Sequence, residues 1–158
     1  MRLTVPGNLL LLGEYAVTDE GGLGLALAVD RRVVVDVEES NSLVVEGHWG
    51  EEAVHWTQGS AEASPLITAI VETWREQLYS REVPMERDSR EPAARILVDS
   101  SAFFTGGRKS GFGSSAAVTV ALTCVLLYLS GFTGSQLLQC GARLALQAHR
   151  RAQGGRGS

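Results

Sequence analysis

The sequence predicts a mixed α and β fold of the α+β class, with its strands concentrated in the first half of the chain. Val33, Val35 and Val37 alternate with other residues, which is the period of a strand with one buried face. Apolar residues recur at helical spacing after Ser64-Pro65, and residues 115–129 form an almost wholly apolar run of helix-forming residues. With 158 residues and 44% hydrophobic content, the chain can bury the core of one domain.

The strands are predicted from alternation and from the turn residues between them. The first two are separated by Pro6-Gly7-Asn8, and residues 18–25 are predicted as a loop because glycines interrupt them. A hairpin is predicted to turn at Gly50. The predicted strands are residues 2–5, 9–12, 33–37, 43–47, 53–57 and 94–99.

Three helices are predicted. The first begins at Ser64-Pro65, because serine is a favoured N-cap and proline is favoured at the first helical position. Its buried face is expected to hold Ile67, Ile70, Val71, Trp74 and Leu78. Residues 79–93, rich in Arg and Glu and containing two prolines, predict an exposed loop. The third helix is expected over residues 135–151, where it would bury Leu137, Leu138, Leu144 and Ala148.

The segment around which the chain is organised is a glycine–serine loop that opens the second helix, at residues 115–129. Gly111 and Gly113 allow a close backbone approach, and the first amides of the helix have no intrahelical partner. With the helix dipole, this arrangement predicts a phosphate site, to which Lys109, the only lysine beside thirteen arginines, would add charge. The alternative is an ordinary helix capped by Ser114 or Ser115, with Lys109 as a solvated cation.

Composition excludes several classes of partner. A net charge of −4 and a pI of about 5.4 provide no general basic surface, so nucleic acid is not an expected partner. The apolar run of the second helix is interrupted at Gly131 and Gly134, so a membrane span is not expected either. Cys124 and Cys140 have neither metal-site spacing nor the number of a disulfide framework, which predicts a reduced, cytoplasmic setting.

Three stretches resemble successive parts of the GHMP kinase superfamily, which comprises galactokinase, homoserine kinase, mevalonate kinase and phosphomevalonate kinase. They are PGNLLLLGEYAV (residues 6–17), KSGFGSSAAV (109–118) and AHRRAQGGRGS (148–158). The last stretch, with Gly13-Glu14-Tyr15 where mevalonate kinases usually carry Gly-Glu-His, most resembles phosphomevalonate kinases. The resemblance implies that residues 1–158 are the amino-terminal ATP-binding domain, with a ribosomal-protein-S5-like mixed sheet packed by helices.

The resemblance also implies roles for individual residues. Lys109, Ser115 and Asn8 are the implied catalytic residues, with Ser115 as the ligand of Mg²⁺. ATP phosphates would be bound by the loop and the helix start, at Gly111, Phe112, Gly113, Ser114, Ser115 and Ala116. The acceptor would be bound by Glu14, Tyr15, His149, Gln153 and Ser158. The alternative is that Glu14 is a solvated loop acid and Tyr15 a half-buried anchor, and similarly ordinary roles remain open for His149 and Gln153.

Two departures from the family pattern limit what the resemblance implies. Asn8 stands where many members have lysine, and asparagine cannot supply charge. The sequence stops at Ser158, whereas in the family an aspartate and a whole carboxy-terminal domain follow, so this chain is expected to be inactive alone. An apolar face left by the missing domain is expected to form a homodimer.

The implied function is transfer of the γ-phosphoryl group of ATP to a small phosphorylated isoprenoid precursor, 5-phosphomevalonate, giving 5-diphosphomevalonate. Mevalonate or sugar kinase activity within the same superfamily is one alternative. A non-catalytic domain for nucleotide binding or association is another, and the asparagine at position 8 and the missing aspartate favour it.

Overall fold

The protein folds around one mixed five-stranded sheet in the order β1-β2-β5-β3-β4. This computed structural model describes residues 1–49, 52–58, 60, 64–79 and 91–154. Neighbouring strands are antiparallel except β3 and β5, which run parallel. The strands are β1 (Arg2–Leu12), β2 (Leu25–Glu39), β3 (Val44–Trp49), β4 (Glu52–Thr57) and β5 (Ala94–Asp99).

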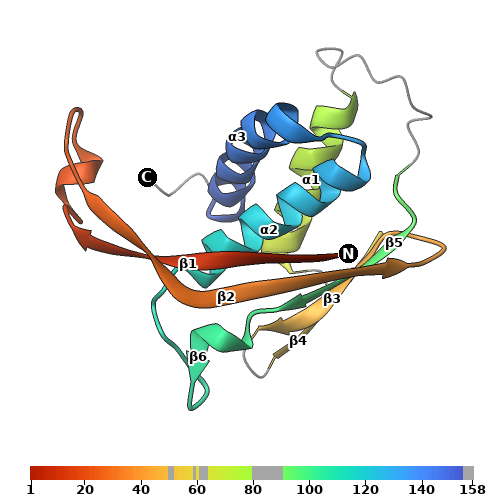
Figure 1. Cartoon of the computed structure of the whole chain (residues 1–158), viewed down its shortest axis with the longest axis horizontal. Helices are drawn as coiled ribbons and strands as arrows, with labels where there is room; N and C mark the ends of the chain where they lie inside the picture. The colour runs from red at the N-terminus through yellow and green to blue at the C-terminus, as the bar shows by residue number, and fades with distance from the viewer. Residues whose placement is uncertain (50–51, 59, 61–63, 80–90, 155–158) are drawn as a thin grey trace.

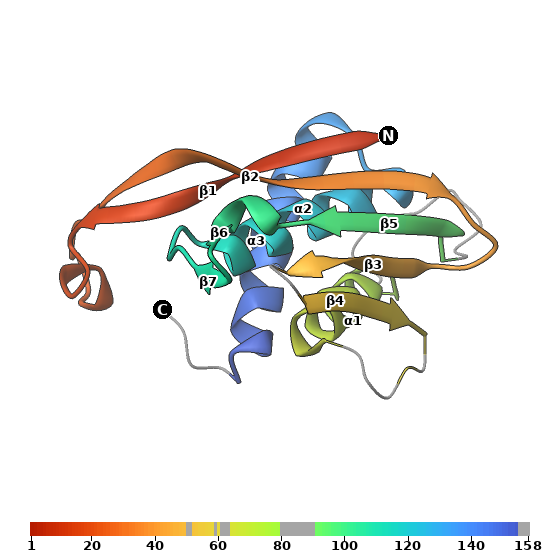
Figure 2. The ribbon, with the colours of Figure 1, turned by 90° about the horizontal axis from the view of Figure 1, so that it is seen from below.

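Three helices cover one face of this sheet (Figures 1 and 2). They are α1 (Pro65–Tyr79), α2 (Ser114–Leu129) and α3 (Gly134–Ala152). Helix α2 packs on β1 and β2 and also contacts α1 and α3. Because α2 has neighbours on several sides, its sequence is apolar nearly all round. Among the described residues, no helix combines the length and the apolar character needed to cross a bilayer.

The core lies between the sheet and the helices, as the alternation of valines predicts. Val33 and Val35 of β2 are fully buried, and the intervening Val34 is not. Of the predicted apolar face of α1, Ile67, Ile70, Val71 and Trp74 are buried and Leu78 is half-buried. The predicted α+β class, with a mixed sheet packed by helices, is confirmed.

The first strand differs from its prediction. Residues 2–5 and 9–12 form one continuous strand, β1, rather than two strands separated by Pro6-Gly7-Asn8. The register against β2 shifts between Pro6 and Gly7. Because β1 is an edge strand, a proline at this irregularity does not remove a hydrogen bond from the interior of the sheet.

Leu138 also differs from its prediction, because its side chain is 76% exposed. The buried stripe of α3 runs through Gly141, Leu144, Ala145 and Ala148. Leu137 is half-buried beside this stripe, and Leu138 lies about 100° further round the helix, on the solvent side. Of the loop predicted over residues 79–93, Tyr79 instead belongs to α1, and residues 80–90 lie outside the described part of the chain.

Two small elements between β5 and α2 lie outside the sequence predictions. A 3-10 turn, η2 (Ser101–Phe103), follows β5, and a short hairpin joins β6 (Phe104–Thr105) to β7 (Arg108–Lys109). Lys109 therefore belongs to a strand that leads into the glycine–serine loop. Phe103 is completely buried, and this anchors the hairpin to the core.

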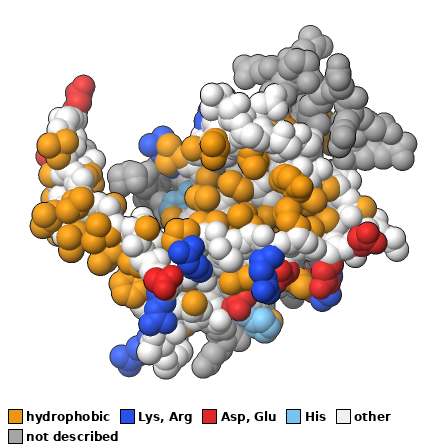
Figure 3. All heavy atoms as spheres, viewed as in Figure 1, with side chains coloured by type: hydrophobic (Ala, Val, Ile, Leu, Met, Phe, Trp, Pro, Cys, Tyr) orange, Lys and Arg blue, Asp and Glu red, His pale blue; other side chains and the backbone are white. Residues whose placement is uncertain are grey.

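The far halves of β1 and β2, with the turn between them, form an arm that projects from the body of the molecule (Figures 1 and 2). The turn contains η1 (Ala16–Thr18). Hydrophobic side chains cover the arm at the left of Figure 3. Its exposed apolar residues are Leu10, Leu11, Leu12, Tyr15, Val17, Leu23, Leu25 and Leu27. The homodimer expected from the sequence remains a prediction.

Candidate functional site

The glycine–serine loop places backbone amides at the start of α2. Gly111 and Gly113 have positive φ angles of 78° and 69°, which suit glycine. Gly113 is the N-cap of α2, and the amide of Ala117 donates to its carbonyl. The helix therefore begins at Ser114, and no serine side chain caps it. The alternative in which Ser114 or Ser115 is the cap is wrong, because Gly113 holds that position.

The loop is fixed to β1 by a close backbone contact. The amide of Asn8 donates to the carbonyl of Phe112 at 3.1 Å. A Cβ atom on Gly113 would collide with the side-chain oxygen of Asn8, and one on Gly7 would collide with the ring of Phe103 and the Phe112 carbonyl. Glycine is therefore needed at both positions, and the opening segment and the loop, about a hundred residues apart, meet here.

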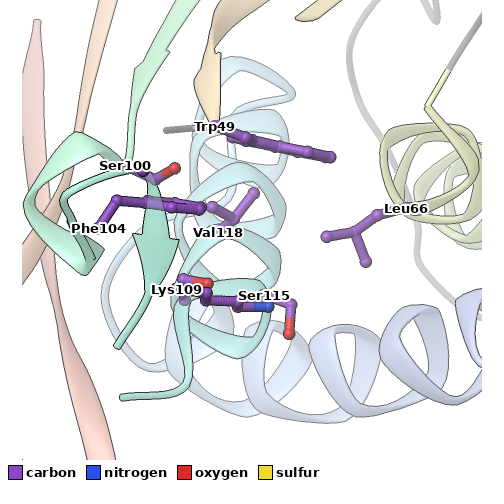
Figure 4. A pocket seen from close by; sticks show the side chains of 9 residues that line it. Trp49, Leu66, Ser100, Phe104, Lys109, Ser115 and Val118 are labelled. Atoms are coloured by element: carbon purple, nitrogen blue, oxygen red, sulfur yellow. The ribbon is translucent and has the colours of Figure 1, made fainter. Parts of the chain in front are cut away.

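A cavity of about 420 Å³ opens beside the start of α2. Figure 4 shows Lys109 and Ser115 at one side of it and Trp49 at the other, with Phe104, the cross-strand partner of Lys109, between them. The cavity thus combines a polar end, next to free helix amides, with an apolar end. Its lining residues are Trp49, Leu66, Ser100, Phe104, Gly107, Lys109, Ser114, Ser115 and Val118.

A second, more open cavity of about 340 Å³ adjoins the first. Trp49, Leu66 and Ser115 line both cavities. The second cavity also reaches His149 and Gln153 at the end of α3, so these two predicted residues lie near Ser115. Together the two cavities form one groove. It is bounded by the end of β3, the starts of α1 and α2, and the end of α3.

Two curated proteins are similar to this chain in sequence. Phosphomevalonate kinase of Saccharolobus solfataricus is 31% identical over 131 residues, which cover 81% of this chain and 36% of that protein. Phosphomevalonate kinase of a Streptomyces species is 32% identical over 146 residues, which cover 80% of this chain and 37% of that protein. The chain thus spans little more than a third of the length of these relatives. No protein-family model matches the chain.

The chain belongs to the GHMP kinase superfamily. Solved structures share its fold. Phosphomevalonate kinase of Streptococcus pneumoniae, in complex with phosphomevalonate and AMPPNP, superposes with a TM-score of 0.70 at 19% identity, covering 98% of this chain and 47% of that one. Mevalonate kinase of Methanococcus jannaschii superposes with a TM-score of 0.66 at 16% identity, and the superposition covers 98% of this chain and 47% of that one.

In this GHMP kinase chain, the predicted site residues fall into two groups. Lys109, Ser114, Ser115, His149 and Gln153 line the joined cavities. Asn8 is exposed and lies against the loop, whose backbone includes Gly111, Phe112, Gly113 and Ala116.

The second group lies on the arm. Glu14 and Tyr15 follow the end of β1, and Tyr15 is 83% exposed rather than half-buried. These two residues therefore belong to the turn of the arm, and neither is among the described residues that line the two cavities. Ser158 lies outside the described residues. The roles assigned to all these residues remain predictions.

Sequence reasoning missed the apolar end of the cavity. Trp49, Phe104 and Leu66 come from β3, β6 and α1, so no local motif links them. The available signal was weak: Trp49 follows an alternating strand and stands directly before the glycine of a predicted hairpin. Only the fold brings this aromatic residue opposite the glycine–serine loop.

The outer face of the sheet carries charged residues that pair with one another. Hydrogen bonds from Arg2 lower the pKa of Asp36, and those from Arg95 lower the pKa of Glu46, which also contacts His55. These pairs are consistent with a solvated sheet face. Within the described ranges, no cluster of three or more His, Cys, Asp or Glu side chains is placed to hold a metal ion.

Proposed function

We propose that this chain binds ATP, with the triphosphate at the start of α2, and that the protein to which it belongs transfers the γ-phosphoryl group to 5-phosphomevalonate. One observation supports nucleotide binding above the others. The free amides at the helix start, the Ser115 hydroxyl and the only lysine of the chain lie at one end of a cavity whose other end is apolar. A nucleotide is divided in the same way as this cavity, because it has an anionic triphosphate at one end and a flat base at the other.

The loop meets the triphosphate mainly through its backbone. The amides of Ser114, Ser115 and Ala116 precede the first intrahelical bond, which the amide of Ala117 makes. They can donate to phosphate oxygens, and the helix dipole favours negative charge at this end. Lys109 adds a full positive charge beside the loop.

Ser115 is the residue that fits a magnesium ion. Mg²⁺ takes oxygen ligands and keeps several waters, so a nucleotide-bound ion needs only one or two ligands from the protein. Ser115 offers one hydroxyl at the junction of both cavities, and its backbone carbonyl is held by the Thr119 hydroxyl at 2.7 Å. When bound, the ion would neutralise phosphate charge during transfer.

The relatives support the choice of acceptor. The two curated proteins are named phosphomevalonate kinase, and the Streptococcus pneumoniae structure holds phosphomevalonate itself. In the proposed reaction, a phosphate oxygen of 5-phosphomevalonate attacks the γ-phosphorus of ATP, the bond to the β-phosphate oxygen breaks, and ADP and 5-diphosphomevalonate form. Asn8, beside the loop, would position an acceptor oxygen by hydrogen bonding without supplying charge.

A doubly charged acceptor also needs cations. Arg151 is paired with Glu72 and Glu76, and Arg32 is paired with Asp30. Arg31 donates to the carbonyl of Ala102, which leaves part of its guanidinium for other contacts. The chain has two pairs of adjacent arginines that could serve, Arg31-Arg32 and Arg150-Arg151. Arg31 and the exposed Arg150 are the better candidates of these pairs.

Calorimetric titration tests the nucleotide proposal. The chain is expected to bind one equivalent of Mg-ATP, more weakly once magnesium is chelated, and absence of binding would overturn the proposal. The acceptor is tested on the full-length gene product by ADP release with 5-phosphomevalonate, mevalonate or galactose as acceptor. Turnover that is faster with mevalonate or galactose would reject the proposed acceptor.

A non-catalytic nucleotide-binding role is the second candidate, and one observation favours it. Asn8 occupies the position beside the loop where many superfamily members carry lysine, and a neutral amide stabilises developing charge less well. The same two measurements separate the candidates. Binding of Mg-ATP without ADP release on the full-length product would favour the non-catalytic role.

A further inference from the structure

The three tryptophans of this chain have different environments. Trp74 is completely buried, and its indole N–H donates to the Ser130 hydroxyl at 3.0 Å. Trp56 is 4% exposed, and the guanidinium of Arg75 lies 5.7 Å from its ring centroid. Both of these rings are occupied by contacts within the protein. Trp49 is only half-buried and lines both cavities beside the start of α2.

The position of Trp49 places a flat aromatic ring at the apolar end of the site. It is the last residue of β3, and Figure 4 shows its ring at the top of the pocket, with Phe104 below it on the left and Leu66 below it on the right. Ser115 and Lys109 lie at the other side of the same cavity. A ligand whose phosphates bind the loop can therefore bring its base against this ring.

Among the described residues that line this part of the cavity, few polar groups are available to read the edge of a base. Ser100 is 1% exposed, and its hydroxyl already donates to the carbonyl of His48 at 3.1 Å. The other described residues of the apolar end are Trp49, Leu66, Phe104 and Val118. Stacking and apolar contact, which every base can make, thus dominate over hydrogen bonding here.

We propose that Trp49 is the stacking surface for the nucleotide base and that it makes the site prefer purine over pyrimidine triphosphates. The inference rests on the proposed nucleotide function and deepens it. A two-ring purine covers more of an indole than a one-ring pyrimidine does, so stacking on Trp49 favours ATP over CTP. Triphosphate binding at the loop is independent of this contact.

The test compares Trp49→Leu with the parent chain in calorimetric titrations of Mg-ATP, Mg-CTP and Mg-tripolyphosphate. Trp49→Leu is expected to weaken ATP binding by about tenfold or more, to weaken CTP binding less, and to leave tripolyphosphate binding unchanged. Trp49→Phe, which keeps an aromatic face, is expected to retain most of the ATP affinity. If Trp49 served only folding, Trp49→Leu would weaken the binding of all three ligands to the same extent, and that result would overturn the inference.

Fluorescence supplies a second, independent readout. ATP is expected to quench tryptophan emission in the parent and in the matched control Trp56→Phe, and the quenching is expected to disappear in Trp49→Phe. Equal ATP affinity in Trp49→Leu and the parent would overturn the inference while leaving nucleotide binding intact. ATP that binds no tighter than tripolyphosphate would also overturn it, and a parent that binds neither ligand would overturn the proposed function as well.

Discussion

Two turns of this chain have nearly the same sequence and different surroundings. SGFGSS (residues 110–115) leads into α2, and SGFTGS (residues 130–135) leads from α2 into α3. Both contain glycines with positive φ, Gly111 and Gly113 in the first turn and Gly131 and Gly134 in the second. Both present a serine at the second position of a helix, Ser115 in α2 and Ser135 in α3.

The second turn uses its polar groups to connect two helices. The amide of Phe132 donates to the carbonyl of Leu127 at 3.0 Å, and its side chain is buried in the core. The hydroxyl of Ser130 donates to the carbonyl of Leu126 at 2.7 Å and accepts a hydrogen bond from Trp74. This turn is a satisfied helix end of the kind in which glycine stops one helix before the next begins.

The first turn is held from outside. Its Phe112 carbonyl accepts a hydrogen bond from Asn8 of β1, and the amide of Ser110 donates to the carbonyl of Phe103. Its helix start opens onto the cavity that also contains Lys109 and Trp49. The comparison teaches that glycine and serine at a helix start specify a turn, whereas a ligand site also needs neighbours that hold the turn and leave space before it.

The largest expected difference between the two turns concerns their glycines. Gly113→Ala forces a left-handed residue to carry a Cβ atom, which costs about 1–2 kcal/mol, and that atom would also collide with Asn8. Gly134→Ala meets the same backbone cost, but nothing lies within 4 Å of its Cβ position. We expect Gly113→Ala to be the more destabilising of the two and to abolish measurable Mg-ATP binding.

Denaturant unfolding and calorimetric titration of the two variants check this prediction. Gly134→Ala is the matched control, because it is expected to lower the free energy of unfolding modestly and to keep nucleotide affinity. Equal losses of stability and affinity in both variants would show that the contact with Asn8 does not distinguish the two turns.

The sequence predicted those elements whose signals are local. The alternating valines of β2, the Ser64-Pro65 helix start and the apolar run of α2 each depend on a few neighbouring residues, and the structure contains all three elements. Pro6 and Gly7 misled the prediction of β1, because turn residues are tolerated at a register shift in an edge strand. Leu138 was predicted to be buried together with Leu137, but one residue along a helix is a rotation of about 100°, and this rotation carries Leu138 to the solvent side.

Of the candidate site, the sequence predicted the polar end but not the apolar end, again because only the polar end has a local signal. Its polar end is one contiguous segment, from Lys109 to Ser115, whereas Trp49 and Leu66 reach the apolar end from separate elements. The contact between Asn8 and Gly113 likewise joins residues far apart in the chain. Such contacts depend on strand order and helix packing, which no local pattern specifies.

A smaller effect is expected from the two serines. Ser115→Ala removes a hydroxyl from both cavities and with it the proposed ligand of Mg²⁺, so Mg-ATP affinity is expected to fall by about tenfold, typical of one hydrogen bond to a charged group. Ser135→Ala changes the same position of α3 and should leave the affinity as it is. Titration with and without magnesium distinguishes metal ligation from simple hydrogen bonding, since loss of a metal ligand matters only when the ion is present.

The smallest expected effect concerns two adjacent cations of β7. Lys109 lines the cavity, whereas its neighbour Arg108 is exposed and is not part of the cavity lining. Successive residues of a strand point to opposite sides, so Lys109 faces the cavity where we propose the triphosphate binds, and Arg108 does not. Because Lys109 is exposed, salt screens its charge, and Lys109→Ala should weaken Mg-ATP by only a few-fold at physiological ionic strength. Titrations at two salt concentrations should show a smaller salt dependence for Lys109→Ala than for the matched control Arg108→Ala, and equal salt dependence in the two variants would mean that Lys109 acts only as part of the overall charge.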